Sequence, residues 1–141
     1  MLSVIHGKIS GTPQIDFNLE KNVQGFIRDA SNKDLINSAH DVSEGGLIVA
    51  IAESCLIGNI GASVTIPLSK AGSLDSCLFA ETPGRIVVSV SQTLANEFKS
   101  LALESQIPVS SLGVISGDKL EWAGILDVSL ESLRIAWEEA L

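Results

Sequence analysis

The chain has 141 residues, of which 45% are hydrophobic and 4% aromatic, and 9 basic against 17 acidic side chains give a formal net charge of −8. This length corresponds to one domain that can bury a core without disulfides or a structural metal, and the apolar content argues against intrinsic disorder. Residues 71–141 hold −6 of the net charge, and this acidity, with no basic stripe, predicts that no nucleic acid is bound.

The sequence carries no signal for export, membrane insertion or disulfide formation. Its longest uninterrupted apolar run, residues 47–52, is far shorter than the about 20 residues that a membrane span needs. The first ten residues do not resemble a secretory signal, so we expect a cytoplasmic protein with no membrane partner. Cys55 and Cys77 have neither Cys-x-x-Cys spacing nor a neighbouring His, which predicts two reduced, mostly buried thiols.

The first half of the chain predicts an opening loop and two helices joined by a strand. Residues 1–17 form the opening loop, and Asn18 is the expected N-cap of a helix over residues 19–32 with apolar positions at helical spacing. A short strand is predicted over residues 35–40. A second, strongly apolar helix over residues 46–57 is expected to be buried on most sides, by sheet on one face and by another domain on the other.

The second half alternates further strand and helix signals. Strands are predicted over residues 60–66, 85–91, 109–115, 119–122 and 125–128, and helices over residues 94–104 and 129–141. This alternation predicts the α/β (α+β) class, with a single mixed β-sheet packed by helices and the strand order left open. Because no linker divides the chain, we expect residues 1–141 to form a single domain.

The segment most informative about chemistry is residues 38–47, SAHDVSEGGL. A predicted strand ends here in a turn that holds an Asp, a hydroxyl and two glycines, and a helix follows directly. Free amides in the first turn of a helix, with its positive dipole end, bind anions, and glycines let a ligand approach the backbone. We therefore regard Asp41 as a candidate Mg²⁺ ligand, and Ser43 with the neighbouring amides as candidate phosphate contacts.

The same loop has a purely structural interpretation, which the spacing alone favours. Ser43 would be the N-cap of the helix, and Asp41 and Glu44 would be acidic residues stabilised by its dipole. Gly45 and Gly46 would then be plain turn residues. The loop contains neither the Gly-Lys-Ser/Thr of a Walker A sequence nor the Gly-x-Gly-x-x-Gly of a dinucleotide fingerprint.

A second segment, residues 78–85 with the sequence LFAETPGR, places a carboxylate and a guanidinium four residues apart across a Pro-Gly turn. Structural pairing of Glu81 with Arg85 is the favoured interpretation. The functional alternative puts both side chains in a cleft, where Arg85 meets phosphate and Glu81 meets an amine or a metal.

The histidines and tryptophans predict structure rather than catalysis. His6 and His40 show no mutual spacing for a metal or a general base, and we interpret His40 as fixing the shape of the loop by hydrogen bonding. No nucleophile elbow is present. We expect Trp122 and Trp137 to be core or interface aromatics.

Taken in order, these motifs resemble the C-terminal domain of phosphoribosylformylglycinamidine synthase. The resemblance rests on the loop at 38–47, Ala52-Glu53, Gly61-Ala62, the LFAE of 78–81 and Gly84-Arg85, and it extends over nearly the whole chain, through residues 11–16 and 107–113 to the Trp137 region. The His-Asp-Val-Ser-x-Gly-Gly-Leu form differs from the loops of aminoimidazole ribonucleotide synthetase, selenophosphate synthetase and thiamine-monophosphate kinase. Glu44 stands where the family usually has Asp, and Thr82 where Ser is commoner.

The resemblance implies a fold like the C-terminal domain of aminoimidazole ribonucleotide synthetase and a ligase of de novo purine biosynthesis. In that reaction ATP activates the amide of formylglycinamide ribonucleotide, and ammonia from glutamine replaces the amide oxygen, which gives formylglycinamidine ribonucleotide, ADP, phosphate and glutamate. The implied cofactors are ATP and Mg²⁺. The implied partners are the remaining domains of the synthetase, a glutaminase subunit or domain and a small-molecule nucleotide substrate. An oligomer that forms through exposed apolar surface is also possible.

The chain is then the C-terminal fragment of a larger synthetase, expected to be inactive alone and to contain no catalytic residue. The candidate nucleotide, phosphate or substrate contacts that the resemblance implies are Asp41, Ser43, Glu44, Gly45, Gly46, Glu81 and Arg85, with Asp41 as the metal ligand. The alternatives are a non-catalytic ligand-binding or assembly module, and the equivalent domain of a sister ATP-dependent synthetase or kinase.

Overall fold

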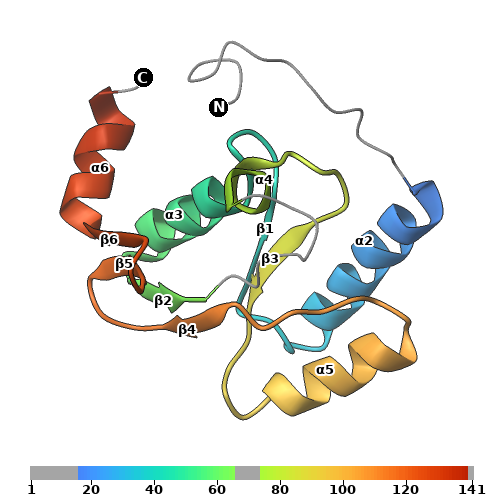
Figure 1. The fold of residues 1–141 in the computed structure, drawn as a ribbon. Coiled ribbons are helices and arrows are strands. Elements are labelled where there is room, and N and C mark those ends of the chain that lie inside the picture. Colours follow the sequence, from blue (N-terminus) through green and yellow to red (C-terminus); the bar gives the residue numbers. More distant parts are fainter. Residues whose placement is uncertain (1–15, 66–73, 140–141) are drawn as a thin grey trace.

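The structure is a computed structural model that describes residues 16–65 and 74–139, in which helices and strands alternate along the chain (Figure 1). The elements in chain order are α2 (Phe17–Asn32), β1 (Ser38–Asp41), α3 (Gly46–Gly58), β2 (Ala62–Val64), α4 (Leu74–Phe79), β3 (Ile86–Ser89), α5 (Ala95–Glu104), β4 (Gly113–Ile115), β5 (Lys119–Trp122), β6 (Leu126–Ser129) and α6 (Leu130–Glu139). The predicted α/β (α+β) class is confirmed. Within the described ranges, no helix is both long and apolar enough to cross a membrane.

The strands of the described chain form two sheets. One is the antiparallel pair β1–β3, and the other has the order β4-β2-β5-β6, in which β2 runs parallel to β5 and the other neighbours are antiparallel. The predicted mixed sheet is therefore present, but the strands are not joined in a single sheet. Alternation of apolar residues identifies strands without specifying which strands pair, so this division could not be read from the sequence.

The main core lies between α3 and the four-stranded sheet. Its buried members are Ile51, Cys55, Ala62, Val64, Leu78, Leu120, Trp122 and Leu130. Leu120 is 1% exposed and Trp122 is 6% exposed, so the expectation of a core tryptophan is confirmed for Trp122. The apolar helix α3 is buried along Ala50, Ile51 and Cys55, whereas Ile57 near its end is exposed.

Helices α2 and α5 pack beside the β1–β3 pair (Figure 1). The rings of Phe26 and Phe98 meet edge to face with centroids 5.4 Å apart. Helix α2 begins at Phe17 because the Asp16 carboxylate accepts from the amides of Asn18 and Leu19, each at 3.0 Å. The prediction of Asn18 as N-cap was wrong, since Asp16 supplies the acceptor two residues earlier.

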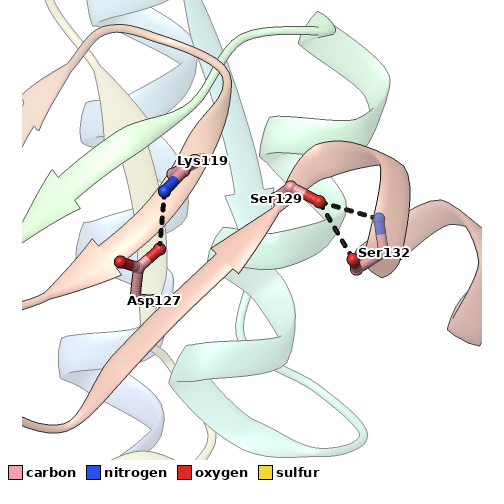
Figure 2. Close-up of polar contacts among 4 residues, drawn as sticks. All are labelled: Lys119, Asp127, Ser129 and Ser132. Atoms are coloured by element: carbon pink, nitrogen blue, oxygen red, sulfur yellow. Dashed lines mark hydrogen bonds and ion pairs between the residues drawn. The ribbon is translucent and has the colours of Figure 1, made fainter.

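The start of α6 is fixed by Ser129, the last residue of β6 (Figure 2). Its hydroxyl accepts from the Ser132 amide at 3.1 Å and donates to the Ser132 hydroxyl at 2.9 Å, which is the pattern of a helix N-cap. The predicted helix over 129–141 therefore begins at Leu130, and residues 140–141 lie outside the described chain. Across β5 and β6, Lys119 donates to Asp127 at 3.2 Å, and this hydrogen bond raises the pKa of Lys119 (Figure 2).

Other element boundaries shift by a few residues from those expected. The strand predicted over 35–40 forms at 38–41, and the one predicted over 60–66 forms at 62–64, with residue 66 outside the described ranges. Helix α4 has no counterpart among the predicted elements. Both cysteines are free; Cys55 is buried and Cys77 half-buried, and burial raises the pKa of the Cys55 thiol.

Candidate functional site

The two segments that sequence analysis singled out lie side by side. Strands β1 and β3 are antiparallel with Asp41 opposite Ile86, and beyond the last pair the Val42 amide donates to the Arg85 carbonyl at 2.9 Å. The segment from the end of β1 to the start of α3, residues 41–46, is therefore held against the turn that precedes β3, residues 80–85. We refer to these as the glycine loop and the acidic turn.

The two glycines give the glycine loop its shape. Gly45 and Gly46 have φ values of +80° and +75°, in the left-handed region that other residues rarely adopt. A Cβ on Gly46 would lie 2.6 Å from both the carbonyl oxygen of Leu78 and the Cα of Phe79. Gly46 is thus the point where the loop packs directly on the backbone at the end of α4, and no side chain fits there.

A carboxylate from the acidic turn accepts a hydrogen bond from the amide at the start of α3. Gly45 is the N-cap of that helix and supplies no side-chain cap, and its N–H donates to Oε1 of Glu81 at 3.0 Å. The structural interpretation that made Ser43 the N-cap was wrong, because the left-handed glycines begin the helix two residues later. Ser43 instead accepts from the Gly46 amide with its main-chain carbonyl at 3.1 Å.

Arg85 binds the backbone of its own turn. Its Nη2 donates to the Ala80 carbonyl and its Nε donates to the Thr82 carbonyl at 3.4 Å. Burial lowers the pKa of Arg85, partly offset by the nearby Cys77. The favoured pairing of Glu81 with Arg85 was wrong: within the described residues no ion pair joins them, because each side chain binds a main-chain group instead.

His40 connects the glycine loop to α3. Its Nδ1 lies 2.8 Å from the Asp41 carbonyl oxygen, and its Nε2 lies 3.1 Å from Oε2 of Glu53. The hydrogen bond to Asp41 agrees with the interpretation that His40 fixes the loop. Glu53 was not among the candidate residues, although a lone carboxylate in an otherwise apolar helix is a signal that could have pointed to it.

Within the part of the chain that the structure describes, the polar side chains of the glycine loop form no complete metal site. Asp41, Ser43 and Glu44 are exposed, and among residues 16–65 and 74–139 no three His, Cys, Asp or Glu side chains gather as metal ligands. Mg²⁺ usually takes one or two protein carboxylates and completes its shell with water and substrate phosphates. The exposed Asp41 carboxylate could be one such protein ligand, with water and substrate phosphates as the other ligands.

A groove of about 410 Å³ lies between α3 and α6 and includes the His40–Glu53 pair in its wall. It is lined by His40, Glu53, Leu56, Ile57, Arg134, Trp137 and Glu138. Arg134 donates to Oδ1 of Asn59 at 3.3 Å, which joins the two helices. Trp137 is 44% exposed and is thus no core residue of the described chain. The groove was not foreseen, since its residues come from three separate segments.

Comparisons with known proteins point to one family. The model for "AIR synthase related protein, C-terminal domain" matches residues 1–122. The phosphoribosylformylglycinamidine synthase subunit PurL of Anaeromyxobacter dehalogenans is 42% identical over 99% of this chain, and that of Thermomicrobium roseum is 35% identical over 96%. The chain spans only 20% and 19% of these relatives, about a fifth of their length.

Solved structures share the fold. Thermotoga maritima PurL complexed with FGAR matches with a TM-score of 0.76 and 19% identity, over 91% of this chain and 23% of that one. The same protein complexed with ATP matches with a TM-score of 0.73 and 20% identity, over 85% and 22%. At this identity the likeness concerns the fold alone, and it confirms the fold that the sequence resemblance implied.

Proposed function

Because the chain belongs to the family of AIR synthase related proteins, C-terminal domain, we propose that residues 1–141 form the C-terminal domain of a phosphoribosylformylglycinamidine synthase subunit. The observation that carries this proposal is the 42% identity over 99% of the chain to a subunit of that name. The His-Asp-Val-Ser-x-Gly-Gly-Leu sequence of the loop, which differs from the loops of the sister synthetases and kinases, supports the same assignment. In the whole protein, ATP would activate the amide of formylglycinamide ribonucleotide, and ammonia derived from glutamine would replace the amide oxygen.

The glycine loop is the part of this domain best suited to contact a nucleotide. Asp41, Ser43 and Glu44 present exposed oxygen atoms at the end of β1, where a Mg²⁺ ion could bridge Asp41 and phosphate oxygens. The acidic turn, through Glu81 and Arg85, would hold this surface in shape. The support is the 3.0 Å contact of Glu81 with Gly45 and the tether of His40 to the Asp41 carbonyl.

We place no catalytic residue in this chain, and its role in the reaction is to complete a site shared with other domains. The relatives are about five times as long, so the remaining domains of the synthetase are its first partners, and a glutaminase subunit or domain is the source of ammonia. One of the Thermotoga maritima matches is a structure named PurLQS, which supports a multi-component parent. We propose a cytoplasmic location, in keeping with purine biosynthesis, and an inactive isolated fragment.

The groove between α3 and α6 is the surface we assign to contact with the rest of the parent. Ile57 is 80% exposed and Trp137 is 44% exposed, and both line the groove. Exposed apolar side chains gathered in this way usually mark a contact surface.

A chimera tests the proposed function. Residues 1–141 would replace the matched fifth of the Anaeromyxobacter dehalogenans subunit, and formation of formylglycinamidine ribonucleotide from formylglycinamide ribonucleotide, ATP and an ammonia source would be measured. We expect activity within about tenfold of the unmodified subunit. A folded chimera that binds ATP through its own remaining domains yet turns over no substrate would contradict the assignment. The same chimera with Gly46→Ala is the matched control and should lose turnover, since the added Cβ would clash with the backbone of Leu78 and Phe79 and disrupt the loop.

A further inference from the structure

Strand β1 has one edge that no other strand of the described chain covers. Its sheet has the order β1-β3, so β3 pairs with one edge of β1 and the other edge is open. The Val42 amide donates to the Arg85 carbonyl at 2.9 Å, and in an antiparallel pair every second residue is bonded to the partner strand. The main-chain groups of His40 therefore point to β3, and those of Ala39 point to the open edge. Such an edge, with unpaired donors and acceptors, is a template for a further strand.

The side chains of β1 point alternately to two different faces. His40 lies on the α3 face, 3.1 Å from Glu53, and Val87, opposite it on β3, packs on the main core. Because side chains alternate along a strand, Ala39 lies on the other face, where its partner Val88 packs among residues of α2 and α5. The β1–β3 pair thus lies between α3 and the helices α2 and α5 (Figure 1). A strand added at the open edge sends its own side chains alternately to the same two faces.

On the α2 face, a groove of about 330 Å³ runs beside the open edge. Its walls include Gln24, Ile27, Arg28 and Ser31, at helical spacing on α2, and residues 36–39. Arg28 is the one charged residue that the described chain contributes to this groove, and within the same ranges no carboxylate forms an ion pair with it. In a chain of net charge −8, this unpaired guanidinium favours an acidic side chain in the groove.

On the α3 face, the groove between α3 and α6 has His40 in its wall and therefore borders the same strand. Ile57 and Trp137 line this groove and are exposed. A large apolar side chain placed against them would remove apolar surface from water on both partners. The surface that we assign to contact with the rest of the parent is thus continuous with the open edge of β1.

We propose that the open edge of β1 binds an extended segment from another domain of the parent synthetase, which pairs with β1 as a third strand. This segment carries an acidic side chain toward Arg28 and a large apolar side chain toward Ile57 and Trp137. Main-chain bonds at Ala39 provide affinity and the two grooves provide specificity, which is how extended peptides are recognised at sheet edges. The source of the segment rests on the proposed function, because the chain spans only 20% of a relative and the rest of the parent is available to supply it.

The experiment measures hydrogen exchange at single amides, by mass spectrometry with electron-transfer fragmentation, in the 141-residue chain and in the chimeric subunit. In the chain alone, the Ala39 amide should exchange within about tenfold of an unstructured peptide. The His40 amide, which points to β3, is the internal control and should exchange about a hundredfold more slowly in both proteins. In the chimera the Ala39 amide should also slow by about a hundredfold, because it pairs with the added strand.

Two pairs of variants in the chimera test the side-chain preferences. Arg28→Glu places a like charge opposite the acidic side chain and should speed Ala39 exchange by about tenfold. Lys99→Glu, the same charge change at an exposed position on α5, should leave it unchanged. Ile57→Ser should speed Ala39 exchange through the apolar groove, and Leu103→Ser should not, although these side chains are 80% and 78% exposed.

An active chimera in which the Ala39 amide exchanges as fast as in the chain alone would overturn the proposal, and so would equal effects within each pair of variants. Slow Ala39 exchange in the chain alone also contradicts it: if independent of concentration, the chain covers its own edge, and if dependent, a second copy does. The proposed function has its own readout, turnover by the chimera. An inactive chimera with a protected Ala39 amide would count against that function alone, and one with an unprotected amide would count against both.

Discussion

Nε2 of His40, on β1, lies 3.1 Å from Oε2 of Glu53, on α3, and each side chain is 24% exposed. The other ring nitrogen of His40 lies 2.8 Å from the carbonyl oxygen of Asp41. Since a protonated imidazole donates from both nitrogens, the imidazolium form satisfies both acceptors at once. The strand end that carries the glycine loop is thereby tied to the helix that follows the loop, which restricts the position of Asp41.

This pair should contribute measurable coupling energy. In a double-mutant cycle of His40→Ala and Glu53→Ala, we expect an interaction energy of about 0.5–1 kcal/mol in the free energy of unfolding, because the pair is half-buried. Urea unfolding of the native chain, the two single variants and the double variant is the measurement. The pair of Lys119 with Asp127, whose side chains are 46% and 66% exposed, is the control and should give a smaller coupling because solvent screens it. Equal coupling for the two pairs would contradict the tie between β1 and α3.

The close packing of Gly46 predicts an unusually costly alanine substitution. Gly46→Ala should destabilise the chain by about 3 kcal/mol or more, since it combines left-handed strain with a clash against the backbone of Leu78 and Phe79. Gly117→Ala is the matched control, because Gly117 has a similar φ of +71° with nothing within 4 Å of the added Cβ, and strain alone should cost about 1–2 kcal/mol. Thermal unfolding of both variants gives the difference, and equal losses would disprove the clash.

Much of this arrangement follows from local sequence, and the rest depends on pairing between distant segments. The strand, glycine turn and helix at 38–57 were predictable because apolar spacing and paired glycines are local signals. The contact of Glu81 with Gly45 joins residues 36 positions apart, and it arises from the β1–β3 pairing that no periodicity encodes. Arg85 is close to Glu81 in sequence, yet it binds the carbonyls of Ala80 and Thr82 in its own turn instead. The sequence shows which side chains carry a charge, but it does not show which main-chain amides and carbonyls the fold brings to them.

The observed N-cap of α2 makes a prediction that separates two neighbouring residues. Asp16→Ala should lower the free energy of unfolding by about 1 kcal/mol, because the carboxylate accepts from two otherwise free amides. Asn18→Ala should change it by less than about 0.5 kcal/mol, since the Asn18 side chain is exposed and lies inside the first turn. Urea unfolding of the two variants is sufficient, and a larger effect for Asn18 would restore it as the cap.

Burial of Cys55 predicts a loss of stability at alkaline pH. The pKa of its thiol is raised above the ordinary value of 9.0, so the unfolded chain releases the thiol proton first as the pH rises. Stability from the neutral buried thiol is complete below that value and is lost as the pH rises from it toward the higher folded-state pKa. Cys55→Ala should remove this part of the pH dependence, measured as melting temperature from about pH 8 to 10 against Cys77→Ala as control. A decline of unchanged steepness in Cys55→Ala would assign it to other groups.

Asp41 supplies the sharpest test of whether the glycine loop of this domain still handles a nucleotide. In the chimeric subunit, Asp41→Asn removes the one exposed carboxylate at the end of β1 while the neutral amide preserves shape and the Asp41 carbonyl contact with His40 remains. If a Mg²⁺ ion joins Asp41 to phosphate oxygens, binding of Mg-ADP measured by calorimetry should weaken by about tenfold or more. Asp127→Asn, an exposed carboxylate on β6, serves as the control and should leave binding unchanged. Native affinity and turnover in Asp41→Asn would reduce the loop to a structural element, since the only remaining role of the carboxylate would be its position near the helix dipole of α3.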